Sequence, residues 1–250
     1  NLKRIDFTVE WHNSVTSSNS ICAQRCEEGA AEGLVIAAMF QEMGRGQRGN
    51  SWESEAGRNL TFSILLRPGH LRVDEQFYLS KVAAASVCDW VSAYVSGDDV
   101  TIKWPNDIYI GDSKVAGILI ENSFSSAMLD TSVVGIGINL NQQTFPDDIP
   151  NPTSLRLATG MEFDLHSSLA EFLECFARRY ELLSDEQSRF QLDEYYLKKL
   201  YRRDLYHGYC DKNGNFKAKI AGVKPTGELV LQLPTGELRV YAFKEVMFLI

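Results

Sequence analysis

The sequence is poor in the residues that build disulfide frameworks and protein-held metal sites. Its 250 residues include five cysteines and four histidines, which form no CxxC pair and no HExxH grouping. The odd cysteine count argues against a disulfide framework, and the scattered histidines argue against a metal ion bound only by protein side chains. This usage fits a reduced, cytoplasmic setting.

Positive charge and long apolar runs are also scarce. The chain has 25 Lys and Arg residues against 33 Asp and Glu residues, a formal net charge of −8. This balance argues against a general polyanion binder, because such proteins usually carry a basic excess. No apolar run approaches the roughly 18 residues that a membrane helix needs, and the start lacks a signal-peptide pattern. We therefore expect no membrane partner, and any ATP site must gather its positive charge locally.

What is present is the composition of a globular protein with a sizeable core, 44% hydrophobic and 23% charged. Strand-length apolar runs alternate with stretches of period near 3.6, which predicts a mixed α/β fold. Strands are expected at residues 34–40, 60–66, 100–104, 108–110, 115–121 and 133–140, and helices at 19–28, 76–95, 165–183 and 187–201.

The hydrophobic pattern of the sequence changes after Tyr206. Short alternating segments follow, separated by the turn pairs Asn213-Gly214, Thr226-Gly227 and Thr235-Gly236. This spacing is typical of a small all-β barrel of about five strands. We therefore predict two domains, residues 1–206 and 207–250.

The first segment that could take part in binding or catalysis is Gly44-Arg45-Gly46-Gln47-Arg48-Gly49, closely followed by Trp52. It matches GxGxxG literally, but a dinucleotide fingerprint needs a helix directly afterwards, and residues 50–57 are poor helix material. Two arginines are also foreign to that motif. Two interpretations stay open: a solvated surface loop, or a loop whose glycines, cations and aromatic ring close over a nucleotide.

The second segment runs from Lys103-Trp104-Pro105-Asn106-Asp107 through a hairpin to Lys114 and Gly117. Pro105 interrupts strand pairing, so Asn106 and Asp107 are expected where the chain turns rather than inside a strand. Lys103 and Lys114 would then face one cavity from two strands, unless both are merely solvated. Gly117 would leave room for a ligand or another backbone.

The third segment, Gly135-Ile136-Gly137-Ile138-Asn139-Leu140-Asn141, places two glycines inside an apolar strand. Glycine weakens a strand, which makes sense where something packs flat against the backbone. A β-bulge is the alternative.

In order and spacing, GRGQRGNSW, KWPND, KVAGIL and GIGIN resemble the catalytic core of bacterial biotin–protein ligases over about residues 14 to 141. The resemblance implies an α/β catalytic domain related to class II aminoacyl-tRNA synthetases and lipoate ligases, with a C-terminal SH3-like β-barrel. It implies that biotin and ATP are joined, with Mg²⁺, into biotinyl-5′-AMP. Biotin would then pass to a lysine of a biotin carboxyl carrier protein of a biotin-dependent carboxylase.

Adenylation requires neutralisation of oxygen charge, for which Lys114 and Arg45 are the first candidates. Mg²⁺ should accompany the phosphates, with Asp107 as the candidate carboxylate, and Asp107 could also assist the transfer step. The residues that the resemblance places at biotin are Ser17, Ser18, Asn19, Gln41, Gly44, Arg45, Gly46, Lys114 and Gly117. Those expected at ATP or the adenylate are Arg48, Trp52, Lys103, Asn106, Gly137 and Asn139.

The sequence departs from the family pattern at two positions. Gln47 stands where the commonest pattern has arginine, which puts in doubt how tightly the intermediate is held, and Ser18 replaces a threonine but keeps the hydroxyl. The family-like motifs begin within 20 residues of Asn1, leaving no room for the DNA-binding domain of some members, so DNA binding is not expected. A homodimer is compatible with the family. The rival hypotheses are a lipoate or octanoate ligase, a non-catalytic biotin sensor and a DNA-binding repressor.

Overall fold

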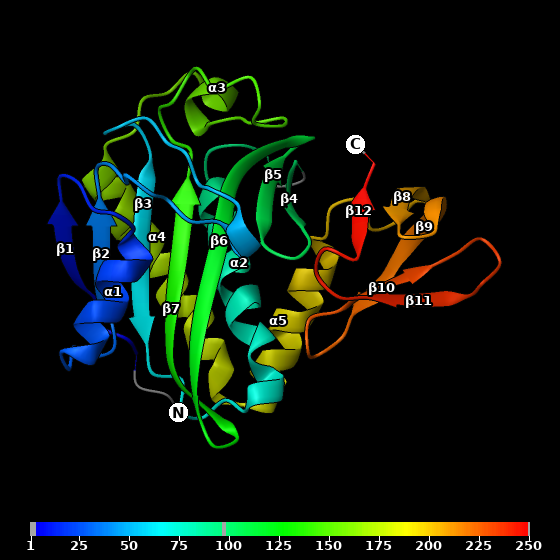
Figure 1. Cartoon of the computed structure of the whole chain (residues 1–250), viewed down its shortest axis with the longest axis horizontal. Helices are drawn as coiled ribbons and strands as arrows, with labels where there is room; N and C mark the ends of the chain where they lie inside the picture. Colours follow the sequence, from blue (N-terminus) through cyan, green and yellow to red (C-terminus); the bar gives the residue numbers. More distant parts are fainter. Residues whose placement is uncertain (1–3, 97–98, 250) are drawn as a thin grey trace.

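The computed structural model describes residues 4–96 and 99–249, without the side chain of Arg48. Its centre is a seven-stranded sheet in the order β1-β2-β3-β7-β6-β5-β4 (Figure 1). Only the β1–β2 pair is parallel among these described strands, and every other neighbour is antiparallel. The strands are β1 Thr8–His12, β2 Leu34–Ala38, β3 Leu60–Leu66, β4 Val100–Lys103, β5 Asp107–Ile110, β6 Ser113–Ser125 and β7 Met128–Ile138.

Helices cover the two faces of this sheet unequally. In Figure 1, α1 Ser18–Glu27 lies in front of the sheet, while α2 Phe77–Val91, α4 Leu165–Glu181 and α5 Glu186–Lys198 lie behind it. β3 lies between α1 and the rear layer, and all seven of its residues are buried. A strand covered on both faces carries an almost continuous apolar sequence, which explains why 60–66 shows no alternation.

The rear helices form because their apolar positions recur on one face. In α4 the buried side chains follow helical spacing, and the Asp164 carboxylate accepts a hydrogen bond from the Ser167 N–H as an N-cap. The short elements are α3 Leu155–Thr159 and three 3₁₀ turns, η1 Gln47–Gly49, η2 Val73–Glu75 and η3 Leu182–Ser184. Among the described residues, no helix has the length and apolar content needed to span a bilayer.

A second, five-stranded antiparallel sheet follows, in the order β11-β10-β9-β8-β12. β9 is long enough to pair with β8 through its first half and with β10 through its second half. Five strands with turns at the expected Gly positions confirm the predicted small C-terminal β unit. The strands are β8 His207–Asp211, β9 Gly214–Val223, β10 Leu229–Gln232, β11 Leu238–Tyr241 and β12 Val246–Phe248.

Buried side chains of the two sheets belong to one continuous core. The indole N–H of Trp104, in the β4–β5 turn, donates a hydrogen bond of 2.8 Å to the Gly227 carbonyl in the β9–β10 turn. The ring of Trp104 also contacts Phe243, with centroids 6.2 Å apart. These contacts bring β12 beside β4 and β5, as Figure 1 shows.

The expected strands and helices all form, but four elements differ from the prediction. β1 and α3 were not predicted, β6 continues to Ser125, and β7 begins at Met128 rather than near residue 133. Asp107 is the first residue of β5 rather than part of the turn. It pairs with Lys103 of β4 on one side and with Gly117 of β6 on the other. Only residues 104–106 are needed for the turn at Pro105, so the expectation for Asn106 holds and that for Asp107 is wrong. All five cysteines are free thiols.

Candidate active site

A cavity of about 1400 Å³ lies where the N-terminus of α1, the loop of residues 41–57, β6, β7, the β4–β5 turn and β12 meet. It collects segments that are far apart in the sequence. Its lining includes these residues singled out from the sequence: Ser17, Ser18, Asn19, Gln41, Arg45, Gly46, Trp52, Lys103, Asn106, Asp107, Lys114, Gly117, Gly137 and Asn139. Gly44 is not part of the lining, and the side chain of Arg48 is outside the described part of the chain.

One end of the cavity is a set of neutral polar groups at the start of α1. The Ser18 N–H donates a hydrogen bond of 2.8 Å to Gln41 Oε1. The Ser63 hydroxyl lies 2.7 Å from that of Ser18 and 2.5 Å from Asn19 Oδ1. Ser17 occupies the N-cap position but makes no side-chain capping bond. We call Ser18, Asn19, Gln41 and Ser63 the polar end.

Gly135 is required at the polar end by a protein side chain. A Cβ atom at this position would lie 2.2 Å from Asn19 Oδ1, far inside van der Waals contact. Asn19 is only 3% exposed, and its carboxamide is held by hydrogen bonds to Ser63 and Glu121. The glycine therefore allows a buried carboxamide to lie directly on the backbone of β7.

The glycine-rich loop is an ordered hairpin rather than the irregular segment that its composition indicates. The Trp52 N–H donates to the Gly44 carbonyl at 2.9 Å, and the Gly46 N–H donates to the Asn50 carbonyl at 2.7 Å. A Cβ at Gly44 would lie 2.1 Å from the Trp52 carbonyl oxygen, which explains that glycine. In Figure 1 the loop crosses in front of β7 and β6, with η1 at its tip.

Trp52 is the group that packs flat against the glycines of the strands. A Cβ at Gly137 would lie 2.3 Å from Trp52 Cε2, and one at Gly117 would lie 3.0 Å from Cζ3. Strand pairing runs without a register shift through Gly135 and Gly137 on both sides, so the β-bulge alternative is excluded. The buried indole N–H of Trp52 has no hydrogen-bond partner in the described residues, a cost that a bound acceptor would remove.

The other end of the cavity carries charge. Lys114 Nζ lies 2.8 Å from Asp107 Oδ1, and the two side chains are 31% and 22% exposed. Lys103 lies between two aromatic rings, with Nζ 5.3 Å from the centroid of Tyr109 and 5.4 Å from that of Phe248. Burial lowers the pKa of Lys103, and the negative charge of Asp107 partly offsets this effect. We call Lys103, Asp107 and Lys114 the charged end.

Two asparagines of the cavity wall bind protein backbone. Asn106 Nδ2 donates to the Ile118 carbonyl, and the Ile118 N–H returns a bond of 3.1 Å to the Asn106 carbonyl. Asn139 Nδ2 donates to the Thr153 carbonyl at 3.0 Å. In this state both amides fix the strands around the charged end, which leaves their expected contact with ATP a prediction.

The donor set for a metal ion is small. Among the described residues, no group of three or more His, Cys, Asp or Glu side chains is arranged to hold one. Asp107 already shares one carboxylate oxygen with Lys114. One free carboxylate oxygen fits Mg²⁺ only if substrate phosphates supply most of the ligands, as they commonly do for this ion.

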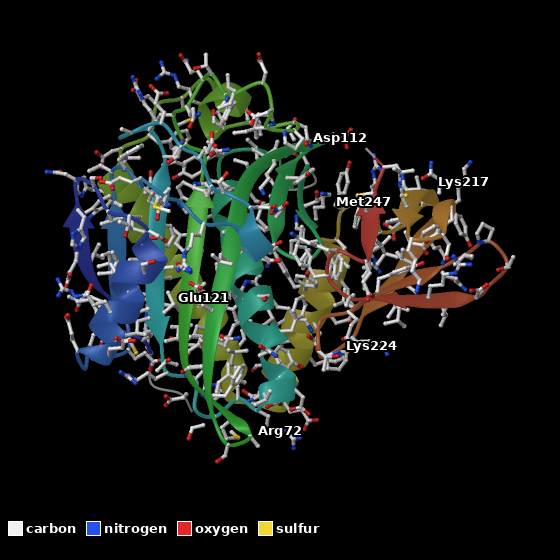
Figure 2. The ribbon with its side chains drawn as sticks, viewed as in Figure 1. Arg72, Asp112, Glu121, Lys217, Lys224 and Met247 are labelled. Atoms are coloured by element: carbon white, nitrogen blue, oxygen red, sulfur yellow. The ribbon has the colours of Figure 1, made fainter. Side chains whose placement is uncertain are left out.

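Among the site residues that were not predicted, three make contacts that shape it. Ser63 completes the polar end, and Phe248 covers Lys103. Glu121, labelled on β6 in Figure 2, forms a bidentate pair with Arg45. A serine in the apolar run 60–66 is a signal that could have been noticed, because a buried hydroxyl needs a partner. Glu121 and Phe248 carry no such local signal.

Comparisons with known proteins agree with this geometry. A family model described as "Biotin/lipoate A/B protein ligase family" matches residues 12–139. The bifunctional ligase/repressor BirA of Bacillus spizizenii is 30% identical over 241 residues, covering 93% of this chain and 71% of that protein. The biotin–[acetyl-CoA-carboxylase] ligase of Paracoccus denitrificans is 30% identical over 244 residues, covering 93% and 98%.

The same likeness appears in three dimensions. The structure of a biotin protein ligase from Aquifex aeolicus in complex with biotin and ATP matches with a TM-score of 0.77 at 26% identity. The match covers 96% of this chain and 97% of that one, so it includes the C-terminal sheet. The predicted α/β fold with a small C-terminal β unit is thereby confirmed. The chain belongs to the biotin/lipoate A/B protein ligase family and, within it, to the biotin–protein ligases.

Proposed function

We propose that this ligase joins biotin to ATP as biotinyl-5′-AMP and then transfers biotin to a lysine of a biotin carboxyl carrier protein. One observation carries the proposal: a single cavity has a neutral polar end and a charged end, joined by a floor of glycine backbone. Along β6 the cavity lining extends from Lys114 to Leu119, roughly 16 Å at the rise of a β-strand. This length suits a small polar ring at one end and a short acid chain reaching the other.

Adenylation needs alignment and charge neutralisation rather than a protein nucleophile. A carboxylate oxygen of biotin attacks the α-phosphorus of ATP, the bond to the β-phosphate oxygen breaks, and pyrophosphate leaves. Lys114 is placed to neutralise the carboxylate and α-phosphate oxygens, with Lys103 supporting it from the C-terminal side. Binding phosphate would also relieve the cost of keeping the buried Lys103 charged.

Mg²⁺ belongs to the proposal as a companion of the triphosphate. Asp107 is the side chain that would contribute one oxygen to it, and the ion would withdraw negative charge from the phosphates. Trp52 and the loop above it exclude water from the anhydride product. In the transfer step the carrier's lysine must first lose a proton. Asp107, which is part of the charged end, is the candidate base.

The setting of the reaction is part of the same proposal. Five free thiols fit a reducing cytoplasm, and the net charge of −8 does not favour a DNA-bound role. The division into residues 1–206 and 207–250 also stays a prediction. β8 begins at His207, and β12 contributes to the cavity, so both proposed domains would build the site.

ATP–pyrophosphate exchange tests the proposal when biotin, lipoate and octanoate are supplied separately. We expect exchange with biotin alone, because the polar end offers neutral donors and acceptors for a ureido ring. Exchange with lipoate or octanoate instead would keep the adenylation chemistry and overturn the assignment of the polar end. If none of the three acids supports exchange, the chain is a non-catalytic binding protein.

A further inference from the structure

Tyr201 lies behind the two aromatic rings that enclose Lys103. These rings come from different parts of the chain, Tyr109 from β5 and Phe248 from β12. The ring of Tyr201 is tilted against both of them, with its centroid 5.2 Å from that of Tyr109 and 6.5 Å from that of Phe248. Tyr201 is 5% exposed and is not part of the cavity lining. It therefore contacts the rings around Lys103 without facing a ligand.

The backbone and the hydroxyl group of Tyr201 keep its ring at this place. Its N–H donates a hydrogen bond of 2.8 Å to the carbonyl of Ile102, the residue before Lys103. Its hydroxyl donates to the carboxylate of Asp112, which is labelled in Figure 2 and lies in the turn between β5 and β6, two residues before Lys114. One residue is thus bonded to β4 and to the β5–β6 turn, and its ring packs against β5 and β12.

The position of Lys103 depends on the rings beside it. A lysine side chain is a flexible stem that loses much rotamer freedom when it is fixed. Two rings restrict those rotations before any ligand arrives, and the ammonium group is attracted to the ring faces. A ring stays in place only while the space behind it is filled, and Tyr201 fills that space for both rings.

We propose that Tyr201 is a positioning residue that aims Lys103 at the phosphate oxygens of ATP by holding the two rings in place; the role of ATP rests on the proposed function. Because Lys103 is ordered when the protein folds, binding of the triphosphate does not have to order it. The polar end is built by other elements, α1, β3 and Gln41. Loss of the Tyr201 ring should therefore weaken the use of ATP and spare that of biotin.

Two substitutions of Tyr201 separate its ring from its hydroxyl. Tyr201→Leu removes the ring, whereas Tyr201→Phe keeps the ring and the backbone bond to Ile102 and loses only the bond to Asp112. In biotin-dependent ATP–pyrophosphate exchange we expect KM for ATP to rise about 3–10-fold in Tyr201→Leu and to stay within about twofold in Tyr201→Phe. KM for biotin should stay within about twofold in both variants. A parallel rise of both KM values in Tyr201→Leu would mean general damage and would overturn the proposal.

Tyr180→Leu is the matched control for the loss of a buried ring. Tyr180 is 4% exposed, its hydroxyl donates to the carboxylate of Glu32, and its ring packs on that of Phe176. It lies on α4 behind the sheet and is not part of the cavity lining. We expect Tyr180→Leu to leave both KM values unchanged. An equal rise in KM for ATP in Tyr180→Leu and Tyr201→Leu would contradict a specific role for Tyr201.

A double variant tests whether Tyr201 acts through Lys103. In Lys103→Met the lysine is absent, so adding Tyr201→Leu should raise KM for ATP no further. A purely structural role would instead raise KM in both backgrounds by the same factor, and that result would exclude positioning of Lys103.

Proton NMR examines the rings around Lys103 without any turnover, because protons near the face of an aromatic ring resonate upfield of their usual position. The ε-methylene signal of Lys103 can be assigned by its loss in Lys103→Met. We expect it to be shifted upfield in the ligand-free protein and to lose at least about half of that shift in Tyr201→Leu but not in Tyr201→Phe. An upfield shift that Tyr201→Leu leaves intact would overturn the proposal. If biotin supports no ATP–pyrophosphate exchange, the proposed function fails, while the NMR result still decides whether Tyr201 positions Lys103.

Discussion

At the scale of single residues, Lys114 combines two properties that adenylation needs. Its ammonium group is held in place by Asp107 at 2.8 Å, and its side chain is still 31% exposed toward the cavity. An incoming carboxylate or phosphate oxygen can therefore reach it without unfolding anything. Its position beside Trp52, with Nζ 5.8 Å from the ring centroid, also keeps part of its surroundings dry.

Lys114→Ala is expected to lower the rate of biotin-dependent ATP–pyrophosphate exchange at least about 100-fold, equivalent to about 2.7 kcal/mol of transition-state stabilisation. The melting temperature should change little, because a partly exposed ion pair contributes little to folding. Lys217→Ala is the control, since Lys217 is an exposed lysine on β9 (Figure 2). Exchange retained in Lys114→Ala would remove this residue from the chemistry.

Residue patterns predicted the lining residues of the loop and the central strands, but not those at 145–152 and 243–249, and not the pairings. Lys103, Lys114 and Asp107 stood out because charged groups next to glycine and proline interruptions are unusual in strands. Glu121 did not, because its partner Arg45 lies 76 residues away in the sequence. A polar residue near the exposed end of a strand has many possible neighbours, and only the path of the loop across the sheet selects one.

At the scale of elements, the loop of residues 41–57 and the two central strands form a matched pair. Trp52 lies where Gly117 and Gly137 leave the backbone bare. Asn19 uses Gly135 in the same way, but it is buried in the first turn of α1. Gly137 thus makes room for Trp52, which belongs to the loop, and Gly135 makes room for Asn19, which belongs to a buried helix turn.

Gly137→Ala should therefore damage the lid more than the fold. Its Cβ would displace Trp52, which can move with its loop, so we expect KM for biotin to rise about tenfold with a stability loss under about 1 kcal/mol. Gly135→Ala is the contrasting variant, because Asn19 cannot move; it should cost about 1–3 kcal/mol in urea unfolding. The double variant Gly137→Ala/Trp52→Ala should bind biotin no worse than Trp52→Ala. The reverse pattern between the two glycines would contradict this assignment.

The sequence predicts elements well where one physical signal dominates. β3 and α2 are long apolar or periodic runs, and their ends are within a few residues of the prediction. β1 was missed although Thr8–His12 alternates polar and apolar residues, because it is only five residues long and lies partly exposed at the sheet edge, so its signal is weak. The first part of β7 was missed because Asp130 and Thr131 interrupt the apolar pattern.

At the scale of the whole molecule, the site depends on how the two sheets join. Phe248 on β12 covers Lys103, and Trp104 beside that lysine bonds to Gly227 in the second sheet. Gly227 lies at φ +103, and a Cβ there would lie 2.6 Å from Cδ2 of Phe77 on α2. The close approach of this one turn sets how near β12 comes to the charged end.

Gly227→Ala is expected to separate the sheets, and Gly236→Ala is its matched control. Gly236 has a similar φ of +90 in the next turn, but no atom lies within 4 Å of its Cβ position. Backbone strain of about 1–3 kcal/mol applies to both variants, whereas the clash with Phe77 adds roughly another 1–3 kcal/mol to Gly227→Ala alone. Urea unfolding measures this difference. Because β12 moves with its sheet, Gly227→Ala should also raise KM for ATP, while Gly236→Ala should leave it unchanged. Equal losses in both variants would mean that backbone strain alone matters and that the join between the sheets does not shape the site.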